Sequence, residues 1–245
     1  MSGHVTSTTR LRVIFVRHGE STNNVHAAAG QEAYTANRVS DPDLSERGKE
    51  QARRVGALLA DPASAETFLG SGAAISEVWV SPHKRTLATA APLAEELVRS
   101  RDLPPRVVVA TELFEAGGIF DESGPDGAAV ALRGLTRTEM TAGWPTYALP
   151  PDVDDSGWYH EAGRESNGAC RSRCASLVAR LRARALALTA DENIIAVTHD
   201  YTSCALLEAL FPDTTSSGDP PLSLADPHRK FTAWRHYNTG FVFHR

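Results

Sequence analysis

Short, mostly apolar runs alternate along the chain with longer segments whose apolar residues recur at helical spacing. Four of these runs, at residues 11–16, 75–80, 107–110 and 193–197, contain mostly valine, isoleucine and other apolar residues. Runs of this length and composition are typical of strands that are buried on both faces. We therefore expect four strands that build the interior of one sheet.

The segments between these runs carry helix signals. Ser45 precedes a helix expected at about residues 46–60. Ser81 followed by Pro82 predicts a helix that starts there and runs to about residue 100. Further helices are expected at about residues 164–189 and 200–210. Strands that alternate with helices favour a mostly parallel sheet flanked by helices, so the expected fold class is an α/β three-layer sandwich.

Residues 117–163 differ in character from the rest of the chain. They are rich in glycine, proline and aspartate, and a capping-box pattern at Thr136 and Glu139 predicts one short helix among them. So long a stretch without strands is more often a lid or an excursion than a linker. Its aromatic residues either line a substrate pocket or pack the segment onto the domain: Trp144, Tyr147, Trp158 and Tyr159.

The simplest organisation is one domain over residues 1–245 with a lid-like insert at about 117–163. At the end of the chain, residues 231–237 and 240–244 read as the two strands of a closing hairpin. No internal repeat interrupts this organisation.

Composition narrows the classes of function. Of the 245 residues, 42% are hydrophobic and 22% are charged, and the formal net charge is -5. This mild acidity argues against a nucleic-acid partner, although a few arginines can still form a local pocket for an anion. No membrane association is expected, because the apolar runs are far shorter than a membrane span.

The cysteines and the first residues bear on the compartment. Cys170, Cys174 and Cys204 are odd in number and lack the spacing of a zinc site or a disulfide framework. Free thiols in a reducing compartment are the expectation. Residues 1–10 are polar and show no secretory signal, so we expect a cytoplasmic protein.

Residues whose side chains can bind a ligand or take part in catalysis follow the carboxyl ends of the expected strands. Arg17 and His18 follow the first strand, Arg85 the second, Glu115 the third and His199 the fourth. Ligands bind outside the carboxyl ends of the strands in sheets of this kind. We therefore expect these side chains to converge at one edge of the sheet.

This set of residue types suits phosphoryl transfer. A neutral imidazole is a nucleophile toward phosphorus near neutral pH, and arginine forks bind phosphoryl oxygens through paired hydrogen bonds. A carboxylic acid can protonate the leaving group. No metal and no cofactor are expected, because the chain has no His-Glu-x-x-His sequence, no paired cysteines and no glycine-rich nucleotide loop.

The pattern of these residues resembles that of the histidine phosphatase superfamily, the phosphoglycerate mutase-like proteins. The resemblance covers most of the chain in family order: Val16-Arg17-His18-Gly19-Glu20-Ser21 with Asn24, Asp43-Leu44-Ser45 with Gly48 and Gln51-Ala52, Ser81 with Arg85-Thr86 and Thr89-Ala90, Glu115, and Val197-Thr198-His199. It implies a phosphoglycerate mutase-like sandwich and a small phosphorylated substrate.

The resemblance also implies a role for each matching residue. His18 would be the nucleophile that forms a phosphohistidine, and Glu115 would be the general acid and base. The residues implied in substrate binding are Arg17, Asn24, Arg85 and His199. Asp200 is an alternative proton donor, because one branch of the superfamily takes its acid from a His-Asp pair; as an N-cap it would have a purely structural role, which we favour.

Departures from the family pattern favour a phosphatase over a mutase. Residues 116–120 differ from the pattern of cofactor-dependent mutases, and Asn23 stands where those mutases usually carry tryptophan. A basic substrate-binding stretch is missing from residues 117–163. Near the site, His83 stands where leucine is common and Ala88 where glutamine is usual.

We therefore expect a metal-independent phosphatase that hydrolyses a phosphomonoester through a phosphohistidine on His18. The alternatives are mutase-type phosphoryl transfer and a non-catalytic domain that binds phosphorylated partners. Three arginines are candidates for a second anionic group on the substrate: Arg133, Arg137 and Arg164.

Overall fold

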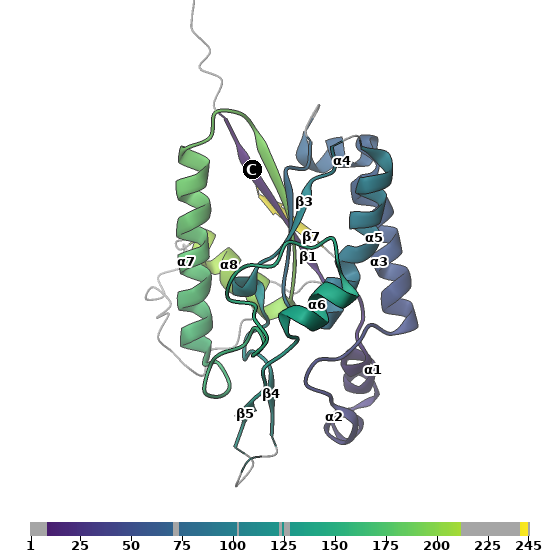
Figure 1. The fold of residues 1–245 in the computed structure, drawn as a ribbon, viewed down its shortest axis with the longest axis vertical. Coiled ribbons are helices and arrows are strands. Elements are labelled where there is room, and N and C mark those ends of the chain that lie inside the picture. The colour runs from purple at the N-terminus through teal and green to yellow at the C-terminus, as the bar shows by residue number, and fades with distance from the viewer. Residues whose placement is uncertain are drawn as a thin grey trace, which may run out of the picture.

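The computed structural model describes residues 9–70, 74–101, 103–122, 124, 128–211 and 241–244. A five-stranded sheet lies at its centre, with the strand order β3-β2-β6-β1-β7 (Figure 1). Four neighbouring strands run parallel: β1 (Leu11–Arg17), β2 (Glu77–Val80), β3 (Arg106–Val109) and β6 (Glu192–Thr198). Each lies within two residues of its expected bounds, so the mostly parallel sheet is confirmed.

The edge strand β7 (Phe241–His244) pairs antiparallel with β1. It falls within the second half of the hairpin expected at the end of the chain. The first half, at residues 231–237, lies outside the described residues.

Alternate residues of the central strands enter two separate cores. Ile14 of β1 and Ile195 of β6 belong to one core, and their neighbours Phe15 and Ile194 belong to the other. All four are at most 1% exposed. Side chains of a strand alternate between the two faces of a sheet, so unbroken apolar runs are required where helices cover both faces.

Helices cover each face of the sheet, as Figure 1 shows. On one side, α3 (Glu46–Ala60), α4 (Pro62–Leu69) and α5 (Lys84–Ser100) pack on the first core. On the other, α7 (Asn167–Leu186) and α8 (Asp200–Leu210) pack on the second. The three cysteines are buried in this second core, and none forms a disulfide within the described part of the chain. Among the described residues no helix is both long and apolar enough to span a membrane.

The start of α5 differs from the expectation. The helix begins at Lys84, with His83 at its N-cap, and does not begin at Ser81. The Ser81 hydroxyl is engaged elsewhere, with the His199 ring. The Asp41 carboxylate instead accepts the Lys84 N–H at 3.1 Å and so satisfies one of the first backbone donors of the helix.

Other helix bounds were wrong by a few residues or were not predicted. Helix α7 begins at Asn167 and not at residue 164, because the Ser166 side chain caps it by accepting from Ala169 N. Three helices had not been expected: α1 (Thr22–Ala29), α2 (Gln31–Asn37) and α4.

The segment at 117–163 contains a small ribbon of β4 (Phe120–Asp121) and β5 (Val130–Ala131), followed by α6 (Arg137–Gly143). The capping box of Thr136 and Glu139 is formed at the start of α6, as expected. Three of the aromatic residues are buried in the first core, and the fourth packs against it: Tyr147, Trp158, Tyr159 and, partly buried, Trp144. The aromatic residues therefore pack the segment onto the sheet layer.

Candidate active site

The loop after β1 is held between β6 and α5. His18 is the first residue beyond β1, and its N–H donates to Thr198 O at 3.0 Å. The next N–H, of Gly19, donates to Thr89 Oγ1 of α5 at 3.0 Å. These bonds fix the backbone of His18 at the carboxyl edge of the sheet.

Helix α3 approaches the same loop so closely that only glycine fits on either side. A Cβ on Gly48 would lie 2.0 Å from Glu20 O, and one on Gly19 would lie 2.5 Å from Gly48 O. The cap of α3 adds to this contact, because Ser45 Oγ accepts from Gly48 N and donates to the Glu20 carboxylate at 2.7 Å. The Glu20 side chain therefore joins the loop to α3.

The hydrogen bond of the His18 ring defines its reactive nitrogen. Nδ1 lies 2.7 Å from Gly19 O, and a carbonyl can only accept, so Nδ1 carries the proton and donates. The lone pair is then on Nε2. Burial, with the nearby charge of Arg85, lowers the pKa of His18 well below 6.5, so the imidazole is neutral near neutral pH.

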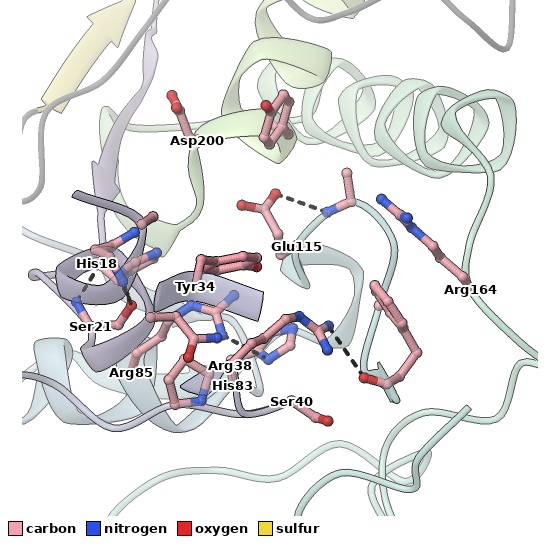
Figure 2. A pocket seen from close by; sticks show the side chains of 18 of the residues that line it. His18, Ser21, Tyr34, Arg38, Ser40, His83, Arg85, Glu115, Arg164 and Asp200 are labelled. Atoms are coloured by element: carbon pink, nitrogen blue, oxygen red, sulfur yellow. Dashed lines mark hydrogen bonds between the residues drawn. The ribbon is translucent and has the colours of Figure 1, made fainter. Parts of the chain in front are cut away.

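A cavity of about 950 Å³ opens at this edge of the sheet (Figure 2). Five of the six expected site residues line it: Arg17, His18, Asn24, Arg85 and Glu115. They come from the ends of β1 and β2, from α1, and from the loop after β3, as strands that end at one edge require. The cavity also borders Asp200, the alternative proton donor.

His199 lies next to His18 and does not line the cavity. It is fully buried, and its ring centroid lies 5.2 Å from that of His18. Its Nε2 is 2.7 Å from Ser81 Oγ, whereas its Nδ1 has no hydrogen-bond partner among the described residues. Burial and the charge of Arg85 lower its pKa well below 6.5, so this ring is neutral too.

Arg85 is held by a buried group of side chains that the sequence had not suggested. Asp41 Oδ1 lies 3.7 Å from the Arg85 guanidinium and 3.2 Å from His83 Nδ1. Burial alone would raise the pKa of Asp41, but the hydrogen bond with His83 and the charge of Arg85 lower it. Burial lowers the pKa of His83 to about 4. The arrangement therefore leaves Asp41 as the anion that orients Arg85.

Glu115 has the environment of a proton donor. Burial raises its pKa, against the opposing charge of Arg85. Its Oε1 accepts from Ala116 N at 2.9 Å and from Thr202 N at 3.2 Å, which fixes the carboxyl group in place. The second oxygen remains for a substrate. In Figure 2 the side chain lies between His18 and Arg164.

Asp200 differs from Glu115 in its partner. Its carboxylate forms an ion pair with Arg17 at 3.6 Å. The residue is the first of α8, with His199 at the N-cap, so it is not the N-cap that we had expected. It places an acidic side chain in the first turn, where the helix dipole favours one.

Asn24 lines the cavity from the first turn of α1. Its Oδ1 accepts from Ser21 N at 3.0 Å, and Ser21 Oγ accepts from Asn24 N, which together form a capping box. Because Oδ1 is used in the cap, the amide group of Asn24 is held in one orientation beside His18. The pattern of a serine three residues before asparagine was the available signal for α1.

The region of the cavity near His18 contains the chemical groups that phosphoryl transfer requires. A neutral imidazole, two guanidinium groups and a carboxyl group of raised pKa line this cavity. Among the described residues no cluster of three histidine, cysteine or acidic side chains could hold a metal ion.

Sequence reasoning missed the cavity residues contributed by α2, Tyr34 and Arg38. Of the three arginines considered for a second anion, only Arg164 lines the cavity. Arg133 is paired with Glu139, and Arg137 donates to the carbonyls of Val153 and Pro150.

The comparison with protein families matches residues 13–108 to the histidine phosphatase superfamily, branch 1. This range runs from β1 to β3 and contains Arg85 and the loop that carries His18. No curated protein sequence matches the chain significantly.

Solved structures share the fold over nearly the whole chain. The ecdysone phosphate phosphatase from Bombix mori, in complex with tungstate, has 18% identity and a TM-score of 0.56, and the match covers 96% of this chain and 89% of that one. A mycobacterial glucosyl-3-phosphoglycerate phosphatase with inorganic phosphate has 19% identity and a TM-score of 0.50, over 95% and 88% of the two chains. YhfR of Bacillus stearothermophilus has 20% identity and a TM-score of 0.50, over 96% and 90%. These similarities show that the fold is shared.

Proposed function

We propose that this chain, whose residues 13–108 match the histidine phosphatase superfamily, is a phosphatase that hydrolyses a phosphomonoester through a phosphohistidine on His18 without a metal ion. The observation that carries the proposal is the state of His18. Its ring is neutral, its Nδ1–H donates a hydrogen bond to Gly19 O, and it lines the cavity together with Arg85.

In the first step, the lone pair of His18 Nε2 attacks phosphorus and the bond between phosphorus and the ester oxygen breaks. The leaving alkoxide takes a proton from Glu115, whose raised pKa favours the protonated form. Arg17 and Arg85 bind the phosphoryl oxygens, and most of the acceleration comes from such fixed positive donors.

In the second step, water attacks the phosphohistidine and gives a proton to the Glu115 carboxylate. The bond between Nε2 and phosphorus breaks, inorganic phosphate is released, and both side chains return to their starting states. The Nδ1–H group of His18 remains hydrogen-bonded to Gly19 O throughout, and this bond stabilises the positive charge of the phosphorylated ring.

Asn24 and His199 are the remaining proposed phosphoryl ligands. Asn24 lines the cavity beside His18. In His199, Nε2 is bonded to Ser81 Oγ, and Nδ1, which has no hydrogen-bond partner among the described residues, is the nitrogen available to a phosphoryl oxygen. Its position next to the His18 ring supports such a contact once a phosphoryl group is bound.

The test is the release of inorganic phosphate from p-nitrophenyl phosphate and a panel of sugar phosphates, with a metal chelator present. We expect turnover by the wild type and none by His18→Ala. His160→Ala serves as the matched control, because His160 is exposed and outside the cavity. Turnover that persists in His18→Ala would disprove the nucleophile, and turnover that the chelator abolishes would disprove metal independence.

A further inference from the structure

The cavity extends well past His18 to a region where two arginines contact one aromatic ring. The guanidinium carbon of Arg38 lies 4.6 Å from the centroid of the Phe120 ring, and that of Arg164 lies 4.8 Å from it. All three residues line the cavity. In Figure 2 both guanidinium groups lie to one side of Glu115, and His18 lies to the other.

These two arginines come from separate parts of the chain. Arg38 is the C-cap residue of α2, and Arg164 stands three residues before α7. Phe120, in β4, is only 9% exposed. Contact with a buried ring restricts where each guanidinium can lie and leaves its N–H groups at the edge of the plane, where they can donate.

The charges of the cavity separate its four arginines into two kinds. Near the nucleophile, Arg17 pairs with Asp200 and Arg85 with Asp41. By contrast, neither Arg38 nor Arg164 forms an ion pair with any of the described carboxylates. Among the described residues, the only polar bond of the Arg38 side chain is a long one, from Nη2 to Phe120 O at 3.4 Å.

Two carboxylates nearby do not neutralise this pair. Asp121 and Glu122 also line this end of the cavity, but both are exposed, and neither is within ion-pair distance of the arginines. Exposed carboxylates interact weakly with charges they do not touch. The two guanidinium groups therefore present an unneutralised positive site within the cavity.

The cavity is large enough for a substrate that reaches from His18 to these two arginines. A volume of about 950 Å³ is at the upper end of ligand pockets and far exceeds what a single phosphoryl group needs. A substrate whose phosphoryl group is bound at His18 would place its distant end toward Arg38 and Arg164. Guanidinium forks bind carboxylate and phosphate oxygens alike.

We propose that Arg38 and Arg164 form a second anion subsite, so that the preferred substrates are phosphomonoesters with a second anionic group, a carboxylate or another phosphate. This inference rests on the proposed phosphatase function and deepens it. It selects Arg164 from the three arginines considered from the sequence and adds Arg38.

The test compares substrates that differ in the second anion alone. One pair is 3-phosphoglycerate and glycerol 1-phosphate; the other is fructose 1,6-bisphosphate and fructose 6-phosphate. We expect the wild type to prefer a doubly anionic member by about tenfold or more in kcat/KM, the value of one charge-assisted contact. The first pair detects a carboxylate and the second a phosphate, so the two pairs identify which anion is bound.

The double variant Arg38→Gln/Arg164→Gln should lose this preference while its turnover of p-nitrophenyl phosphate stays unchanged. Arg53→Gln/Arg54→Gln, which removes the same number of charges from exposed positions on α3, should keep the preference. A wild type that shows no preference for either doubly anionic compound would overturn the proposal. So would a double variant that retains the preference.

Binding separates this proposal from the function on which it rests. Calorimetric titration of the same pairs into His18→Ala measures the affinity preference without turnover. If p-nitrophenyl phosphate is not hydrolysed but His18→Ala binds the doubly anionic compounds more tightly, the subsite stands and the phosphatase function fails. If p-nitrophenyl phosphate is hydrolysed but His18→Ala binds both members of each pair equally, the phosphatase function stands and the subsite fails.

Discussion

The position of one proton on His18 decides what this side chain can do. The bond from Nδ1 to Gly19 O at 2.7 Å selects the tautomer, and burial together with Arg85 keeps the ring neutral. In the sequence, this residue was recognisable by its place after a buried strand. Its tautomer was not, because it depends on where the carbonyl of the next residue points.

The choice between two candidate acids is also made at the residue scale. Glu115→Gln should reduce kcat/KM on alkyl phosphates by ~10²–10⁴-fold, the usual value of a general acid. On p-nitrophenyl phosphate the loss in the bond-breaking step should be far smaller, because a nitrophenolate leaves without a proton.

Asp200→Asn is the comparison variant, measured on the same two classes of substrate. We expect no such dependence on the leaving group, since Asp200 is paired with Arg17. If Asp200→Asn showed the leaving-group dependence and Glu115→Gln did not, the proton donor would be Asp200.

The buried histidines should make the protein sensitive to acid. The pKa values of His18, His83 and His199 are lowered by burial, that of His83 to about 4. In the unfolded chain each imidazole takes up a proton near pH 6.5, whereas in the folded protein it stays neutral to a lower pH. The free energy of unfolding is therefore highest above pH 6.5 and decreases as the pH falls. At pH 5 the loss from His83 alone is about 2 kcal/mol. The raised pKa of Glu115 acts in the opposite sense, and it offsets part of the loss.

Urea unfolding at several pH values between 7.5 and 5 measures this dependence. His83→Leu should lose less stability over that interval than the wild type, because one buried imidazole is removed. Equal slopes for the two proteins would contradict the assignment of His83 as a buried neutral side chain.

Among elements, the contact of α3 with the nucleophile loop has the strictest geometry. Gly48→Ala would bring a Cβ within 2.0 Å of Glu20 O, so the helix or the loop must move. We expect a loss of stability of about 1–3 kcal/mol, as in other overpacked sites. We also expect a larger fall in kcat/KM than the stability loss explains, since the loop holds His18.

Gly143→Ala is the matched control for this helix substitution. Gly143 lies in α6, and nothing approaches its Cβ position within 4 Å. Thermal unfolding and kinetics of the two variants should therefore differ, with Gly143→Ala unchanged or slightly stabilised. Equal behaviour of both variants would show that the close approach is not important.

The elements that could be predicted are those with a strong apolar pattern. The four parallel strands are marked by short apolar runs and α3 by an apolar helical period, and α3 has its expected bounds of 46–60. The start of α5 could not be predicted, because the Ser81 hydroxyl bonds to His199, which is 118 positions away in the chain. Helices α1 and α2 have no buried residues, so they lack the apolar stripe that makes a helix recognisable.

For the molecule as a whole, the site lies where separate segments meet. The carboxyl edge of the sheet supplies the predicted residues, which could be identified because the strand ends are marked in the sequence. Arg38 and Phe120, by contrast, come from elements that meet only in the folded chain, and no local pattern connects them. A net charge of -5 coexists with four arginines in one cavity, so overall charge is a poor guide to what the site binds.

The central claim is that a phosphoryl group becomes covalently attached to His18. The most direct measurement is rapid mixing with substrate, quenching in alkali, which preserves phosphohistidine, and mass spectrometry of the peptides. We expect the mass of one phosphoryl group on the peptide that contains His18 in the wild type, and none in His18→Ala. Glu115→Gln, in which the second step should be slow, ought to accumulate more of the adduct from p-nitrophenyl phosphate. Substrate turnover with no adduct on this peptide, or with the adduct on another residue, would contradict the account.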